Sequence, residues 1–269
     1  MKLSKLSLIL VSTAFVAACG GGGADPAPNN SGGGSSSPTA TANKAEGFYT
    51  GTFSTAAFPN GVLQTIILEN DQVWGAYGTR DATTGANIIY GIFQGTGASN
   101  NGSYSSSDIK DFYYTGTTTT GTLSASYQAG VSLNGSASAN GQSASFVASV
   151  PANSTYVYSA PALLADITGS WTGTTLGGAI SSFTIGNTGS FSVSNAGCVT
   201  SGTVVPRPSG KNVFDLSVVV ATSSACGGNA GLSATGIVVT NLLTNGSRQL
   251  VALYVDSSRT AGTAFIATR

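Results

Sequence analysis

The sequence has 269 residues, of which only 7% are charged, and its ten Lys and Arg balance its ten Asp and Glu. Such a neutral chain does not attract nucleic acid, so we expect no nucleic-acid partner. The chain contains no His, which removes Ser-His-Asp and Cys-His catalysis and the usual zinc sites. We therefore expect no metal, no cofactor and no catalytic residue.

The first residues have the pattern of an export signal. Lys2 and Lys5 give a short positive start, and residues 6–16 are almost wholly apolar. A run of this length is typical of a signal-peptide core and is too short to span a bilayer as a helix. We expect residues 1–18 to be a signal peptide. Without Lys2 and Lys5, eight basic residues stand against ten acidic ones, so the net charge becomes −2.

The apolar run ends in Val16-Ala17-Ala18-Cys19. This tetrapeptide resembles the lipobox of bacterial lipoproteins, in which the cysteine is acylated and becomes the new N-terminus. The resemblance implies a lipid on Cys19 that anchors the chain to a membrane without a transmembrane helix. Gly20 rather than Asp follows Cys19, which by that family's sorting rule implies the outer membrane. The resemblance does not decide between the cell-surface face and the periplasmic face. An ordinary secretory signal with a coincidental cysteine is the alternative.

Residues 19–45, which begin with the lipidated cysteine, are rich in Gly, Ser, Pro, Asn, Ala and Thr and show no apolar periodicity. A segment of this composition cannot bury enough apolar surface to offset the entropy lost on ordering. We expect a flexible, disordered tether that holds the folded part away from the membrane.

From Glu46 onward the chain has the pattern of β-strands. Apolar and polar residues alternate, as at Phe214, Leu216, Val218 and Val220, which is typical of a strand with one buried face. Five Asn-Gly pairs supply the positive φ angles that tight hairpin turns need. They are Asn60-Gly61, Asn101-Gly102, Asn134-Gly135, Asn140-Gly141 and Asn245-Gly246.

We expect an all-β fold, an antiparallel meander that forms two small eight-stranded barrels or curved sheets, because closure removes exposed strand edges. The first β-domain is predicted at 46–158, a connector at 159–166 and the second β-domain at 167–269. The first strands are expected at 47–53, 62–69, 72–78, 87–94, 111–115, 121–127, 130–138 and 143–150. The second set is expected at 167–175, 180–185, 189–194, 199–206, 211–220, 232–240, 248–256 and 262–267.

An internal repeat supports this division, because Gly47-Phe48-Tyr49-Thr50-Gly51-Thr52-Phe53 is similar to Gly169-Ser170-Trp171-Thr172-Gly173-Thr174-Thr175. Chance similarity in a chain rich in Gly and Thr is the alternative. The order of lipobox, glycine-rich tether and two repeated β-domains resembles the β-barrel surface lipoproteins of Gram-negative bacteria, such as the transferrin-binding and complement-factor-binding lipoproteins. Their host-binding loops have no counterpart in this sequence, so the resemblance implies no particular partner.

With Cys19 assigned to the lipid, Cys198 and Cys226 are an even pair in an oxidising compartment, and we predict a disulfide between them. Two free thiols are the alternative, whereas a zinc pair is not expected without His or a CxxC motif. A local resemblance to the META-type envelope domains supports the bridge but implies no function, and it departs from that family at Val199. It is carried by Trp171, Gly197-Cys198, Gly202 and Ala225-Cys226.

Aromatic residues give the best indication of a binding surface. Phe112-Tyr113-Tyr114 is a triplet, so on a strand either Tyr113 alone or Phe112 with Tyr114 must point outward, and Trp74 and Tyr77 lie nearby. Exposed aromatic side chains on a rigid sheet can anchor a protein or a glycan. The alternative is that they fill a barrel interior or its rim.

The charged residues give weaker indications. Asp108 and Asp111 are the nearest approach to a calcium cluster, without the spacing of a calcium loop. Four basic residues of the second half could line an anion-binding patch, or could protect sheet edges from aggregation. They are Arg207, Lys211, Arg248 and Arg259.

These observations favour a membrane-anchored, non-enzymatic envelope lipoprotein that binds a protein or glycan at or near the cell surface. One alternative is a carrier that holds a small apolar ligand inside a barrel. Another is a glycan-cleaving enzyme, which needs only two carboxylates. A hollow barrel would favour the carrier, a filled barrel the binder, and a cleft with paired carboxylates the enzyme.

Overall fold

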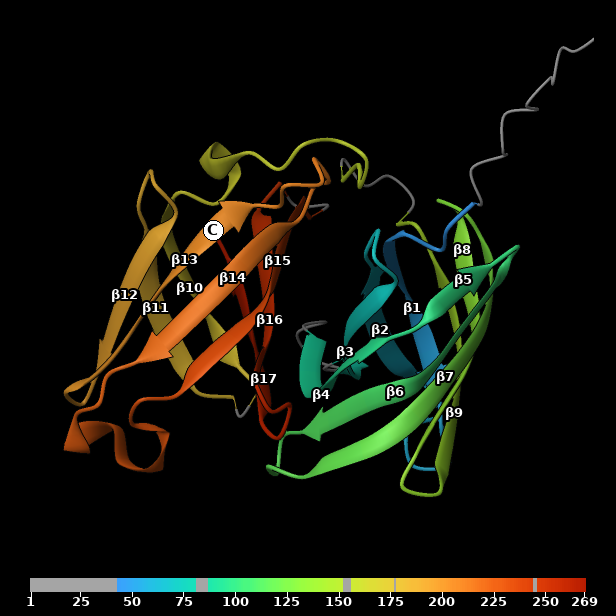
Figure 1. Ribbon diagram of the computed structural model, residues 1–269, viewed down its shortest axis with the longest axis horizontal. Helices are drawn as coiled ribbons and strands as arrows, with labels where there is room; N and C mark the ends of the chain where they lie inside the picture. The colour runs from blue at the N-terminus through green and yellow to red at the C-terminus, as the bar shows by residue number, and fades with distance from the viewer. Residues whose placement is uncertain (1–42, 81–86, 152–155, 177, 244–245) are drawn as a thin grey trace, which may run out of the picture. The chain divides into compact units, whose positions relative to one another are not determined.

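The computed structural model describes residues 43–80, 87–151, 156–176, 178–243 and 246–269 (Figure 1). The predicted signal peptide, Cys19 and most of the predicted tether lie outside these residues. The segment Thr41–Arg269 forms one compact unit. In the described part of the chain, no helix is long and apolar enough to cross a membrane.

The first β-domain is a closed antiparallel barrel of eight strands, β1–β4 and β6–β9, with the short β5 added beside β6. It closes because β1 pairs with β9 and β4 pairs with β6. The strands are β1 (Gly47–Ser54), β2 (Gly61–Ile67), β3 (Gln72–Arg80), β4 (Asn87–Thr96), β5 (Ala98–Asn100), β6 (Ser103–Tyr113), β7 (Thr118–Gln128), β8 (Ser132–Ala139) and β9 (Gln142–Ser149).

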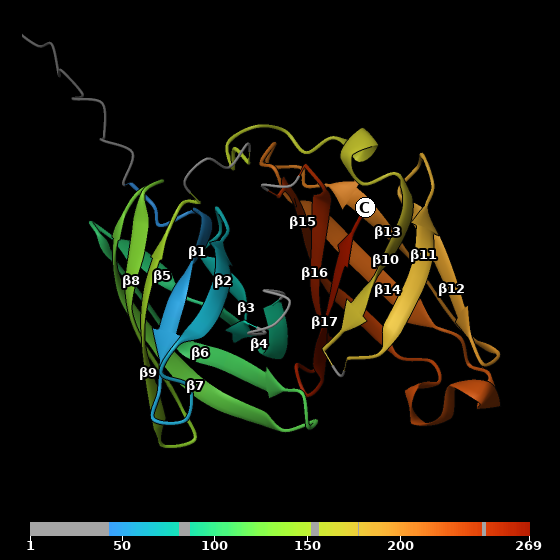
Figure 2. The ribbon, with the colours of Figure 1, turned by 180° about the vertical axis from the view of Figure 1, so that it is seen from behind.

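The second β-domain is also a closed eight-stranded barrel, in which β10 pairs with β17 (Figures 1 and 2). The predicted all-β fold of two eight-stranded barrels is therefore confirmed. The strands are β10 (Gly169–Thr175), β11 (Ile180–Ile185), β12 (Ser190–Asn195), β13 (Cys198–Pro206), β14 (Phe214–Val220), β15 (Ser233–Leu242), β16 (Arg248–Asp256) and β17 (Gly262–Thr268), with 3₁₀ helices at Leu164–Asp166 and Ser224–Asn229.

The two repeated segments open the two barrels in the same way. The Tyr49 hydroxyl of β1 donates a 3.0 Å hydrogen bond to the Ala45 carbonyl oxygen, and Trp171 Nε1 of β10 donates a 2.6 Å bond to the Ile167 carbonyl oxygen. In both cases the acceptor lies four residues upstream, and both rings are buried. This shared geometry gives the internal repeat a structural basis.

The chain segment before β1 belongs to the barrel, which corrects the predicted end of the tether at residue 45. Ala45 is fully buried, and its backbone N–H donates to Ser99 Oγ at 3.0 Å. Lys44 Nζ lies 3.2 Å from the Asp71 carboxylate, and the Tyr127 hydroxyl donates to the Asn43 carbonyl oxygen. The entering chain therefore seals one end of the first barrel.

The Asn-Gly pairs do not all form turns. Asn101-Gly102 and Asn140-Gly141 have positive φ at both residues and connect adjacent strands, as predicted. Asn134-Gly135 instead lies within β8, where Gly135 allows close approach of the β7 backbone. Asn245 lies outside the described residues. A turn signal is thus overridden where a strand needs a residue without a side chain.

The two barrels share an apolar core in addition to their own interiors. Outward-facing side chains of β1–β4 and β6, such as Phe48 and Ile92, pack in one cluster with Val239 and Leu253 of the second barrel. Tyr156, before the predicted connector, joins the same cluster. Burial on both faces explains the continuous apolar runs in these strands, since alternation requires one solvated face.

The predicted disulfide is confirmed. Cys198 at the start of β13 is bonded to Cys226 in the 3₁₀ helix Ser224–Asn229, with their Cα atoms 4.7 Å apart. The bridge ties a long connection between β14 and β15 to the wall of the second barrel.

Candidate functional site

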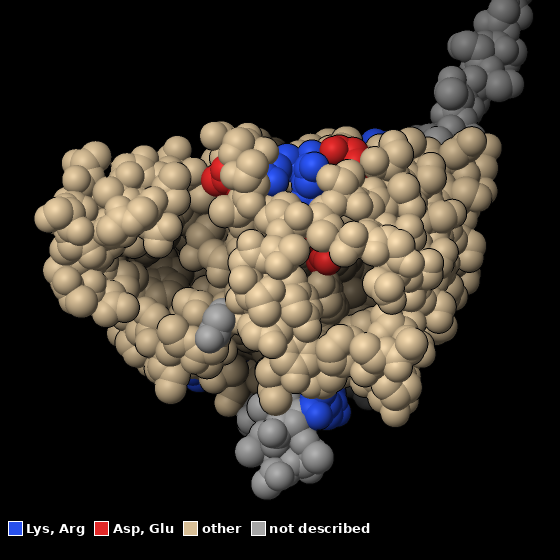
Figure 3. Space-filling model, turned by 90° about the horizontal axis from the view of Figure 1, so that it is seen from below, with Lys and Arg blue, Asp and Glu red and all other residues tan. Residues whose placement is uncertain are grey.

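The first barrel contains a cavity of about 450 Å³ that is open to solvent at one end. The loop after β1 and the turn between β8 and β9 contribute to its lining, so the mouth lies at the end opposite to the sealed one. Figure 3 looks onto that side and shows a hollowed surface with few charged side chains around the hollows. The large apolar side chains of the lining are Phe53, Phe58, Leu63, Phe93, Ile109, Leu123, Leu133 and Phe146, and its aromatic hydroxyls come from Tyr77 and Tyr113.

Glycines opposite aromatic rings keep this interior open. Phe93 of β4 pairs across the sheet with Gly75 of β3, and Tyr77 of β3 pairs with Gly91 of β4. A Cβ atom at either glycine would come within 2.2 Å of the opposite ring. Each ring therefore lies along the wall over a glycine, where a side chain would otherwise push it toward the barrel centre. The same arrangement recurs at the pair of Phe53 and Gly61.

One carboxylate, Asp111 of β6, lies in the apolar lining. The Tyr77 ring reaches across Gly91, and its hydroxyl donates a 2.7 Å hydrogen bond to Asp111 Oδ1. Phe93 is the direct neighbour of Asp111 on β4. Burial raises the pKa of the Asp111 carboxyl above its ordinary value, and the Tyr77 hydrogen bond offsets this in part. Burial also raises the pKa of the Tyr77 hydroxyl, so it remains a donor at neutral pH.

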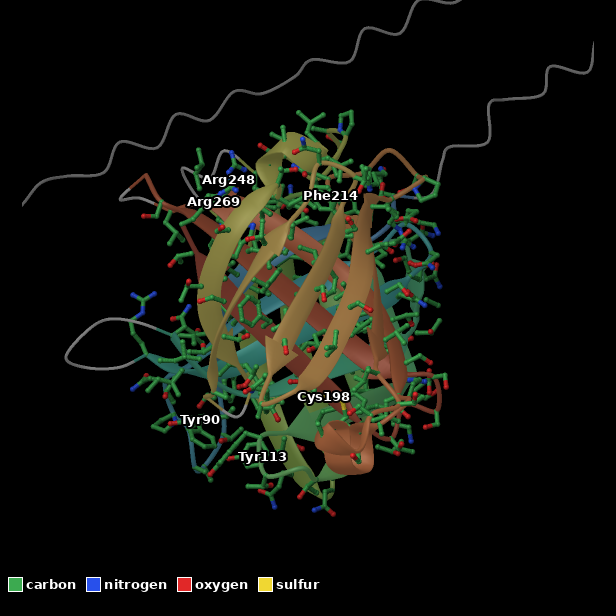
Figure 4. All side chains as sticks on the ribbon, turned by 90° about the vertical axis from the view of Figure 1, so that its left-hand side faces the viewer. Tyr90, Tyr113, Cys198, Phe214, Arg248 and Arg269 are labelled. Atoms are coloured by element: carbon green, nitrogen blue, oxygen red, sulfur yellow. A yellow bond between two sulfur atoms is a disulfide. The ribbon has the colours of Figure 1, made fainter. Side chains whose placement is uncertain are left out.

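A row of aromatic rings continues from the mouth. The ring centroids of Phe58 and Tyr90 are 5.5 Å apart, those of Tyr90 and Tyr114 5.7 Å, and those of Tyr114 and Tyr113 4.7 Å. Phe58 and Tyr113 line the cavity, whereas Tyr90 and Tyr114 line a second hollow of about 290 Å³. Figure 4 shows Tyr90 and Tyr113 at this end of the molecule. The row forms an apolar rim.

The predicted aromatic anchors separate into three groups. Trp74 and Phe112 are 5% and 2% exposed, because the second barrel covers the face on which they lie. The expectation that they are surface anchors is therefore wrong. Tyr77 and Tyr113 line the cavity, and Tyr114 is 50% exposed at the rim.

The basic residues of the second half do not form an anion-binding patch, because acidic partners neutralise them. Arg207 contacts Glu69 and Asp215, Lys211 contacts Glu46, Arg248 contacts Asp166 and Arg259 contacts Asp108. Figure 4 shows Arg248 beside Arg269, whose guanidinium lies 4.4 Å from the centre of the Trp171 ring. Three of these contacts, to Glu46, Glu69 and Asp108, join one barrel to the other.

No family model matches the chain, and no curated protein matches it. A solved structure of a protein with unknown function from the DUF3598 family of Nostoc punctiforme shares 12% identity, and the match covers 83% of this chain and 94% of that one. Its TM-score of 0.23 supports no conclusion about fold or function.

Sequence reasoning missed most of the cavity residues. Phe53, Phe93 and Asp111 are unremarkable members of alternating strands, and their importance comes from the residue opposite each of them. The sequence does show Gly75 and Gly91, which interrupt two predicted strands. Their role depends on the register between β3 and β4, because it places each glycine opposite an aromatic ring.

Proposed function

We propose that the chain is a membrane-anchored envelope lipoprotein whose first barrel binds a small, largely apolar ligand. The observation that carries this proposal is the cavity of about 450 Å³, whose inner surface is mostly apolar although hydroxyl and amide side chains also line it. Closed eight-stranded barrels of this kind can hold one small ligand. The sequence alone favoured a protein that binds a protein or glycan partner. The hollow interior instead favours a carrier of a small ligand.

The two ends of the first barrel support this proposal. Residues 43–46 seal the end at which the chain enters, and the loop after β1 lines the mouth at the other end. Residues 43–46 therefore do not occupy the mouth, which leaves it free for a ligand to enter.

The glycan-cleaving alternative finds less support. The described lining of the cavity contains a single carboxylate, Asp111. Glycoside hydrolysis by the common mechanisms uses two carboxyl groups that flank the bond. Cavity geometry therefore favours binding over this type of chemistry.

The test is a cavity-filling substitution. Ala137 of β8 lines the cavity, so Ala137→Phe should fill part of it, whereas Ser136→Phe adds the same ring at the exposed neighbouring position. We expect residues 41–269 to bind an apolar fluorescent probe with a 1:1 stoichiometry. Ala137→Phe should weaken binding at least about tenfold through a loss of about 1.4 kcal/mol, and Ser136→Phe should leave it unchanged.

Native mass spectrometry of the chain purified from its source gives a second readout, since a bound ligand would add mass to the protein. Equal probe affinity in both variants, or no binding by the unsubstituted chain, would contradict the proposed cavity function.

A further inference from the structure

We infer that the ligand of the first barrel is an amphiphilic amine, whose positively charged nitrogen binds at Asp111 and whose apolar body fills the rest of the cavity. This inference rests on the proposed function and adds the chemical class of the ligand. It is carried by the position of Asp111, by the lack of a cationic partner for it among the described residues and by the aromatic rings around it.

Asp111 differs from the other described carboxylates in its partners. Among the described residues, six of the remaining seven carboxylates form ion pairs with Lys or Arg: Glu46, Glu69, Asp71, Asp108, Asp166 and Asp215. The seventh, Asp256, accepts hydrogen bonds from the backbone N–H groups of Thr260 and Ala261 and from nearby hydroxyls. Among the described residues Asp111 forms no such ion pair: the uncharged Tyr77 hydroxyl donates a 2.7 Å hydrogen bond to it, and the uncharged Thr119 hydroxyl also favours its ionised form.

A carboxylate in an apolar wall is stabilised by a compensating charge. An ionised carboxyl group has about four acceptor positions, of which Tyr77 occupies one. Burial disfavours the ionised form, and a cation within hydrogen-bond distance restores it. The described residues that line the cavity include no Lys or Arg. The missing positive charge is therefore expected to come from the ligand.

The neighbouring rings suit an ammonium group. Phe93 is the cross-strand neighbour of Asp111, Tyr77 contacts its carboxylate, and Tyr113 lies two positions further along β6 on the same face. Aromatic faces attract cations through the ring quadrupole, more strongly in a desolvated site. Tyr77 and Tyr113 also line the same cavity. A carboxylate and several rings together favour an amine over a neutral alcohol or an anion.

The rest of the lining suits an apolar body. Leu63, Leu123 and Leu133 come from β2, β7 and β8, and Phe146 comes from β9. Burial of each methylene contributes about 0.8 kcal/mol. An amine with a short hydrocarbon portion would satisfy both parts of the cavity at once.

The experiment compares three molecules that share one chain and differ in the head group: octylamine, octanol and octanoate. Calorimetric titration of residues 41–269 at pH 7 should show that octylamine binds at least about tenfold more tightly than octanol, as a charge-assisted hydrogen bond allows. Octanoate should bind most weakly. Asp111→Asn keeps the size of the side chain and should abolish the preference for octylamine while octanol still binds.

Octanol binding by Asp111→Asn is the control for a folded cavity. Should that variant not fold, Tyr77→Phe keeps the carboxylate and the ring, and it is expected to retain the preference for octylamine. Equal affinities for octylamine and octanol in the unsubstituted chain would overturn the inference and leave the cavity function standing. Failure of all three molecules to bind would instead contradict the proposed function itself.

Discussion

At Gly91, the absence of one Cβ atom decides where the ring of Tyr77 lies. A Cβ there would meet the Tyr77 ring and hydroxyl at 2.2 Å. Gly91→Ala is therefore expected to turn this ring into the cavity and to break its hydrogen bond to Asp111. Overpacking of this kind costs about 1–3 kcal/mol. Thermal unfolding should show a lower midpoint, and the apolar probe should bind more weakly.

Gly228 provides the matched control for this substitution. A Cβ at Gly228 would meet nothing within 4 Å, and its φ lies outside the left-handed region. Gly228→Ala should leave both the midpoint and the probe affinity close to those of the unsubstituted chain. If Gly91→Ala behaved in the same way as Gly228→Ala, the glycine would not be what holds the ring against the wall.

The strands show how far element prediction from this sequence can reach. Strands at 180–185 and 248–256 are predicted with the observed bounds, because turn residues flank them on both sides. At β6 the prediction begins at 111, whereas the strand begins at Ser103. Two features hide its first half. The buried position Ser106 is polar, and a bulge between Ser106 and Ile109 interrupts the period of two.

The disulfide acts at the scale of the elements that it joins. Cys198 and Cys226 are 28 residues apart, and a loop of this length stabilises the folded state by about 3–4 kcal/mol in the chain-entropy description. Replacement of both cysteines by Ser should lower the unfolding midpoint. A reducing agent should lower the midpoint of the unsubstituted chain to that of the double Ser variant.

The double Ser variant is also the control for the reducing agent, which should not change its midpoint. Because both cysteines lie in the second barrel, binding of the probe to the first barrel should persist in the variant at temperatures below unfolding. An unchanged midpoint for both the variant and the reduced protein would contradict a stabilising role of the bridge.

At the scale of the whole molecule, the sequence could indicate which face a side chain occupies but not what covers that face. Trp74 and Phe112 do lie outside the first barrel, and the second barrel buries them. The hollow interior could not be predicted from the sequence either, because it depends on which residue lies opposite each aromatic ring across the sheet. The sequence therefore predicted two barrels and a disulfide, while the location of the cavity required the register of the strands.

Burial of Trp74 between the barrels leads to a prediction about cooperativity. Trp74 packs in the cluster that contains residues of both barrels, so loss of its ring should weaken the contact between them. Trp74→Ala is expected to cost about 3–5 kcal/mol, the range for truncation of a buried large aromatic side chain. Calorimetry should show one transition for residues 41–269, and two less cooperative transitions for the variant.

Tyr114→Ala is the control, because Tyr114 is 50% exposed at the rim and its replacement should change the unfolding midpoint little. The two substitutions separate two roles for an outward-facing aromatic residue. A surface anchor would lose affinity for a partner without losing stability, whereas a residue of the shared core loses stability first. A midpoint unchanged by Trp74→Ala would mean that the barrels fold independently, and the ion pairs of Arg207, Lys211 and Arg259 would then be surface contacts of little energetic weight.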